Sequence, residues 1–192
     1  MKYLGKPAGM WALFAGSFEK HLTVEFDLTA GQAKDVAARA KKKYREIIAK
    51  LPEFDKRDRF EMNIVNCAML AAFILCMPQR PDIKTLTDYY AAAMMTPTMK
   101  AFCRASGKKK FTPKDIEGMK ATAKLRAGDR NPYSWNMDFF EYEDGSGYEA
   151  RFTTCGICTL MQVLGLYDLT PALCHLDYTM SDAGGASDFV RE

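Results

Sequence analysis

The sequence contains no apolar run long enough to cross a membrane. Its longest run, CAMLAAFILCM from Cys67 to Met77, is well short of the roughly 20 residues that a spanning helix needs. The apolar segment from Met10 to Phe14 is shorter still and is followed by Gly16 and Ser17, which argues against a signal peptide. We therefore expect a cytoplasmic protein without a membrane partner.

The chain also lacks a strong excess of charge of either sign. Its 27 Lys and Arg residues and 24 Asp and Glu residues give a formal net charge of +3, and the lysine runs at 41–43 and 108–110 are short. Such a balance does not require a nucleic-acid partner, and we expect none. Without internal repeats or low-complexity tracts, its 192 residues, 48% of them hydrophobic, fit a single domain over 1–192. Homo-oligomer formation is left open.

A disulfide framework is not indicated by the six cysteines. Cys67, Cys76 and Cys103 lie within apolar or helical patterns and not in the loops of a small cross-linked fold. Reduced thiols in a cytoplasmic protein are therefore the favoured interpretation.

Helical periodicity dominates the first two-thirds of the chain. Apolar residues spaced by three and four predict a helix that Thr29 caps and that ends before Pro52. Asn63 and Asn66 share one side of the largely apolar second helix, where they either line a polar pocket or bond nearby backbone. The predicted helices span about 10–18, 29–51, 57–77, 83–95, 97–103 and 113–126, with an extended segment at 21–28.

The period changes near residue 133 from helical to extended. Residues 135–139 and 148–154 alternate between apolar and polar, and the loop Glu143 to Gly147 between them predicts a β-hairpin. This order predicts an α+β fold. A helix-rich N-terminal two-thirds, about 1–130, packs on a small antiparallel sheet, and a C-terminal cysteine-containing helical segment completes the part from about 133 to 192.

The most distinctive chemistry lies between residues 148 and 177. Cys155 and Cys158 form a C-x-x-C pair, and Cys174, His175 and Asp177 follow. Cys155 is predicted at the end of a strand and before a short helix at 159–166, where the positive end of the helix dipole favours a thiolate. Such a thiolate can act as a nucleophile, with an imidazole as general base and a carboxylate to orient it.

Zinc binding and simple burial are the alternatives. The spacings of Cys155, Cys158, Cys174 and His175 fall within zinc-site ranges, with Asp177 as a substitute ligand. The intervening segment is apolar, however, and the second half is not another C-x-x-C. Cysteine is also among the residues most often buried, so spacing alone leaves the three interpretations open.

These residues resemble the L-2-amino-thiazoline-4-carboxylic acid hydrolase family. The resemblance rests on Cys155-Gly156-Ile157-Cys158, the short helix ending at Gly165-Leu166, Pro171, Cys174-His175-Leu176-Asp177 and Gly184-Gly185. It implies a hydrolase that acts on a C–N bond of a small cyclic amidine and opens the 2-aminothiazoline ring to a carbamoyl-cysteine product. It also implies a further cysteine-bearing strand, which this sequence does not contain before Glu192.

The resemblance implies roles for individual residues. Asp177 pairs with the substrate amidinium, and the attack comes from a Cys155 or Cys174 thiolate or from water activated by His175. Arg151 binds the substrate carboxylate, with Cys158 as a second substrate-binding residue. No cofactor is required unless the cysteines hold zinc. The alternative function is a non-catalytic small-molecule or zinc-binding module built from the same residues.

Overall fold

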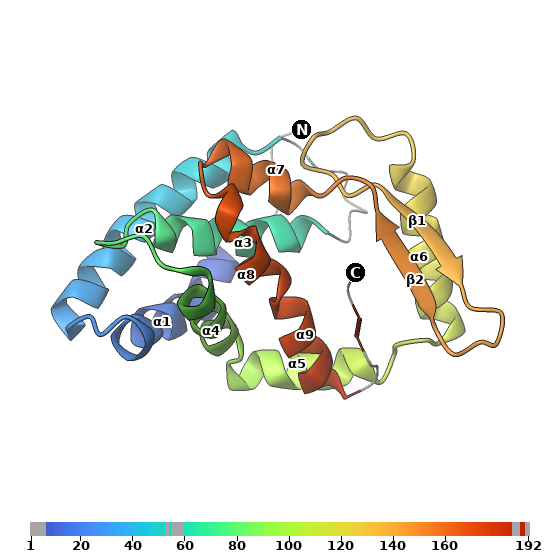
Figure 1. Ribbon diagram of the computed structural model, residues 1–192, viewed down its shortest axis with the longest axis horizontal. Helices are drawn as coiled ribbons and strands as arrows, with labels where there is room; N and C mark the ends of the chain where they lie inside the picture. Colours follow the sequence, from blue (N-terminus) through green and yellow to red (C-terminus); the bar gives the residue numbers. More distant parts are fainter. Residues whose placement is uncertain (1–6, 53, 55–59, 186–188, 191–192) are drawn as a thin grey trace.

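The computed structural model describes residues 7–52, 54, 60–185 and 189–190. They form a helix-dominated α+β fold, which confirms the predicted fold class (Figure 1). The helices are α1 (Pro7–Glu25), α2 (Ala30–Lys50), α3 (Glu61–Ile74), α4 (Ile83–Met94), α5 (Pro97–Gly107), α6 (Pro113–Arg126), α7 (Gly156–Val163), α8 (Thr170–Cys174) and α9 (Leu176–Gly184), with a 3-10 turn, η1 (Tyr167–Leu169).

The core is centred on α3. Its residues from Cys67 to Ile74 are all buried, because α3 packs against α1, α2 and α7. Aromatic rings connect the surrounding helices: Trp11 of α1 stacks on Phe73 of α3 with ring centroids 5.5 Å apart. Helix α3 is thus the central element on which the C-terminal helices are placed.

Local signals in the sequence set the starts of two helices correctly. Thr29 caps α2 in a capping box with Gln32, and Thr112 caps α6 by accepting from the Asp115 backbone N–H. The extended segment predicted at 21–28 is wrong for residues 21–25, which continue α1. The reason is tertiary: Phe18 and Leu22, one turn apart, are fully buried, and their burial favours a continuous helix.

The sheet has two strands, β1 (Met137–Glu141) and β2 (Tyr148–Phe152). They pair antiparallel, with Met137 opposite Phe152 and Glu141 opposite Tyr148, so the predicted hairpin is confirmed. The hairpin packs on α6 and lies to one side of the helical core (Figure 1). The helix-rich part therefore packs mainly on itself, and α6 is its principal contact with the sheet.

The C-terminal segment returns to the helical core. Helix α7 packs on α3, α8 on α4, and α9 on α5. Helix α7 begins at Gly156, three residues earlier than predicted, and Cys155 is its N-cap in an extended conformation (φ −134°, ψ 115°). Within the described residues, every helix is too short or too polar to span a bilayer.

Candidate functional site

A buried thiol and phenol mark the centre of the candidate site. Cys67 on α3 and Tyr90 on α4 are 3% and 1% exposed, and the Tyr90 hydroxyl hydrogen-bonds the Cys67 sulfur. The charges that act on Cys67 come from Cys155, Asp177 and Cys174. The N-cap of α7 (Cys155), α8 (Cys174) and α9 (Asp177) therefore place acidic groups near enough to the buried Cys67 sulfur to act on its charge.

The Cys67–Tyr90 pair stays neutral near physiological pH. Burial raises the pKa of the Cys67 thiol well above its usual value, and the nearby Cys155, Asp177 and Cys174 raise it further, against a smaller lowering by the Tyr90 hydrogen bond. Burial also raises the pKa of the Tyr90 hydroxyl, and Asp177 is among the acidic groups that add to this shift. Cys67 is thus unsuited to be the attacking thiolate.

The remaining members of the group lie closer to solvent. Cys155 and Cys174 are half-buried and Asp177 is exposed. The group therefore extends from the surface to a neutral, buried floor, and its ionisable members are acidic. Such an arrangement suits a small cationic ligand, because the carboxylate of Asp177 at the surface attracts a positive charge.

Asn66 adds a hydrogen-bond acceptor next to Cys67 on α3. Its side-chain oxygen is buried and has no hydrogen-bond partner among the described residues. A buried acceptor without a partner is costly, so this oxygen is suited to accept from a bound N–H group. Of the two interpretations for Asn63 and Asn66, backbone bonding finds no support at Asn66.

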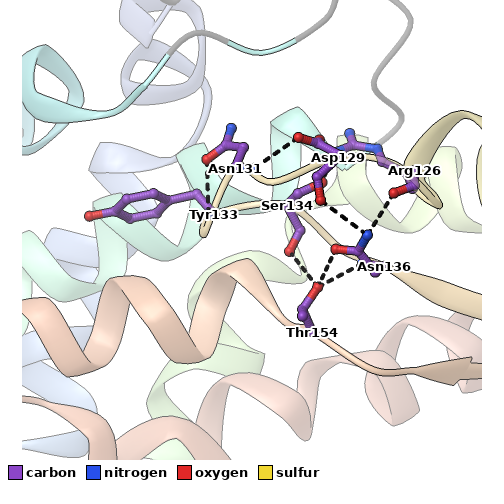
Figure 2. Close-up of polar contacts among 7 residues, drawn as sticks. All are labelled: Arg126, Asp129, Asn131, Tyr133, Ser134, Asn136 and Thr154. Atoms are coloured by element: carbon purple, nitrogen blue, oxygen red, sulfur yellow. Dashed lines mark hydrogen bonds and ion pairs between the residues drawn. The ribbon is translucent and has the colours of Figure 1, made fainter.

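A polar network holds the backbone in front of α7 (Figure 2). Asn136 donates through Nδ2 to the Arg126 carbonyl at 2.6 Å, its Oδ1 accepts from the Thr154 hydroxyl at 2.6 Å, and its backbone N–H donates to Thr154 Oγ1 at 2.9 Å. Because Thr154 directly precedes Cys155, this network fixes the approach of the chain to the N-cap of α7.

The network is anchored by a buried cation. Arg126 is 3% exposed; its guanidinium donates to the Ser134 hydroxyl and forms an ion pair with Asp129 at 3.1 Å. Partial burial raises the pKa of the Asp129 carboxyl, but hydrogen bonds from Asn131 and Ser134 and the Arg126 charge outweigh it, so the pKa is lowered. Asp129 is therefore ionised and orders the turn before β1.

The other predicted site residues lie further from the Cys67 thiol or on the surface. His175 joins α8 to α9, is exposed, and its ring centroid is 5.5 Å from that of Tyr178. Arg151 is 63% exposed in its side chain, pairs with Glu149 at 3.0 Å and lies over the Phe140 ring. Cys158 is half-buried in the first turn of α7.

The arrangement of the possible ligand side chains gives the zinc interpretation no support. Among the described residues, no group of three or more His, Cys, Asp or Glu side chains has an arrangement that could hold a metal ion. Cys155 and Cys174 lie near the buried Cys67 thiol, and Cys155, Cys158, Cys174 and His175 do not form a ligand set.

Comparison with known proteins supplies the family. The family model for L-2-amino-thiazoline-4-carboxylic acid hydrolase matches residues 62–191, more than half of the chain. The chain belongs to this family. The matched region of this L-2-amino-thiazoline-4-carboxylic acid hydrolase family member includes all the residues around Cys67, from α3 to α9. No curated protein and no solved structure gives a significant match.

Sequence reasoning missed Cys67 and Tyr90. Cys67 lies within the apolar run at 67–77, which indicates burial, and Tyr90 lies within the helix predicted at 83–95, so neither position points to a site. The only sequence signal at either residue is a polar neighbour in an apolar helix: Asn66 precedes Cys67, and Tyr89 precedes Tyr90. These signals do not show that the two helices bring the side chains together.

Proposed function

We propose that the protein hydrolyses 2-aminothiazoline-4-carboxylate or a closely related cyclic amidine. Family membership supports the substrate class, and the placement of Cys155, Cys174 and Asp177 near enough to the buried Cys67 to act on its charge is the observation that carries the proposal. An amidinium is a small planar cation with N–H donors. The acidic surroundings, and the buried acceptor on Asn66, match both of these properties.

The atoms of the reaction limit which bond breaks. A carbamoyl-cysteine product keeps both nitrogens of the amidine, so the nucleophile adds to the carbon of the C=N bond and the ring opens at the C–S bond, not at the C–N bond expected from the resemblance. The sulfur leaves as a thiolate, takes up a proton and becomes the thiol of the product. Water supplies the carbamoyl oxygen.

Cys155 is the proposed nucleophile. Its place at the N-cap of α7 exposes it to the positive end of the helix dipole, and it is half-buried where Cys67 is fully buried. The Cys155 thiolate attacks the amidinium carbon and the ring sulfur departs. Water then attacks the same carbon, expels the Cys155 thiolate and leaves the carbamoyl group.

The neighbouring residues bind and orient the substrate. Asp177 pairs with the amidinium, which disperses its charge over two nitrogens and favours a carboxylate partner. Cys174 contacts the substrate beside Asp177, and the Cys67–Tyr90 pair forms a floor that excludes water. Arg151 is proposed to bind the substrate carboxylate, which requires it to exchange Glu149 for the substrate.

The test is turnover of L-2-amino-thiazoline-4-carboxylic acid, followed as carbamoyl-cysteine by mass spectrometry. We expect Cys155→Ser and Asp177→Asn to lower kcat/KM by at least about 10²-fold, the scale of removing one catalytic or electrostatic group. Cys76→Ala, a buried cysteine beyond the end of α3, is the matched control and retains turnover. Wild-type rates from Cys155→Ser would refute the nucleophile, and binding without turnover by the wild type would favour the binding module.

A further inference from the structure

Cys158 has no role in the proposed reaction, although it belongs to the most distinctive motif of the sequence. It occupies the third position of α7, whose N-cap is Cys155. Cys158 therefore lies about one helical turn from Cys155 on α7.

The N-cap and third positions of a helix bring their side chains together. This chain shows it twice. In α2 the Thr29 hydroxyl is 2.9 Å from Gln32 Oε1, and in α4 the Thr85 hydroxyl donates to Asp82 at 2.7 Å. Cys155, like those two caps, has an extended backbone, and Cys158 holds the same position relative to it, so the two thiols can approach each other.

The thiols of Cys155 and Cys158 are also exposed enough to solvent for thiol–disulfide exchange. Each is half-buried, in contrast to the buried Cys67, Cys76 and Cys103. Two cysteines separated by two residues at the start of a helix are spaced for disulfide exchange. The Cys155 side chain makes no capping hydrogen bond that a disulfide would have to break.

We propose that Cys155 and Cys158 form a redox-active dithiol that exchanges with low-molecular-weight disulfides. The Cys155 thiolate attacks the small disulfide, forms a mixed disulfide and releases one small thiolate. Cys158 then attacks Cys155 and releases the second. Two protein thiols are oxidised to a disulfide while one small disulfide is reduced to two thiols. The oxidised state removes the nucleophile from the hydrolytic reaction, a consequence that rests on the proposed function.

The experiment incubates the reduced full chain with oxidised glutathione, alkylates the remaining thiols and maps the peptides by mass spectrometry. The expected result is loss of two alkylatable thiols and a Cys155–Cys158 disulfide. Cys158→Ser should instead accumulate a glutathione mixed disulfide at Cys155, and Cys174→Ser should still form the bridge. A bridge to Cys67 or Cys174, or six thiols that all remain alkylatable, would overturn the proposal.

Activity separates this inference from the function on which it draws. If both hold, oxidation abolishes turnover of the thiazoline acid and dithiothreitol restores it. Bound substrate should also protect the Cys155 thiolate, and so the activity, from inactivation by oxidised glutathione. If only the dithiol holds, the bridge forms and neither state turns over substrate. If only the hydrolase holds, turnover is present and the bridge does not form.

Discussion

Gly156→Ala should displace the start of α7 and with it Cys155. Gly156 is the first residue of α7 and is buried against the loop before β1. A Cβ added there would lie 2.7 Å from the Tyr133 carbonyl carbon and closer still to the carbonyl oxygen. It would also lie 3.0 Å from the Trp135 ring. Ordinary carbon contacts begin at about 3.5 Å.

The cost follows from which atoms must yield. The Tyr133 backbone is held by a hydrogen bond from its N–H to Asn131 at 3.0 Å, and Trp135 is 4% exposed, so neither can move freely. Overpacking of this kind costs about 1–3 kcal/mol. If α7 moves instead, a displacement of about 1 Å at a catalytic group lowers turnover by roughly 10²-fold.

Urea unfolding measures the first effect, and kcat/KM with the thiazoline acid, together with the alkylation rate of Cys155, measures the second. Gly16→Ala is the matched control. Gly16 lies inside α1 with open space around the added Cβ, so it should stabilise the protein by about 0.5–1 kcal/mol. Gly156→Ala with wild-type stability and wild-type Cys155 reactivity would refute the reasoning.

Three further perturbations test the buried polar groups and a surface ion pair. The raised pKa values of Cys67 and Tyr90 mean that the native state holds these protons after the unfolded chain has lost them. The unfolding free energy should therefore fall by about 1.4 kcal/mol per pH unit above about pH 8.5 on account of Cys67, and by a similar further amount above about pH 10 on account of Tyr90; a flat alkaline profile in urea titrations would contradict this. Asn136→Ala removes the hydrogen bonds to Arg126 and Thr154 and should destabilise the protein by about 1–3 kcal/mol, measured by calorimetry, with an unchanged Tm as the refuting result. Arg80→Ala breaks an exposed ion pair with Asp168, whose partners are 50% and 65% exposed, and an exposed hydrogen bond to the Gly165 carbonyl; a loss above about 1 kcal/mol would be inconsistent with solvent screening.

The site could be predicted from the sequence only where its residues are neighbours along the chain. Cys155 at a strand-to-helix junction followed from the extended pattern at 148–154 and the helical spacing at 159–166, and α7 confirms that position. Cys67 and Tyr90, in contrast, come from two different helices. Their meeting with Cys155 depends on how α3, α4 and α7 pack, and apolar periodicity identifies a buried face without naming its partner.

Local physical chemistry in the sequence determined the starts of α2 and α6, the hairpin and the fold class, because caps, turns and periodicity act within a few residues. Tertiary packing decided the rest. It continued α1 through residues 21–25 by burying Leu22, placed the sheet against α6, and enclosed Cys67 with Tyr90. The physical reason is that burial and pKa depend on which surfaces meet, and residues far apart in the chain set those surfaces.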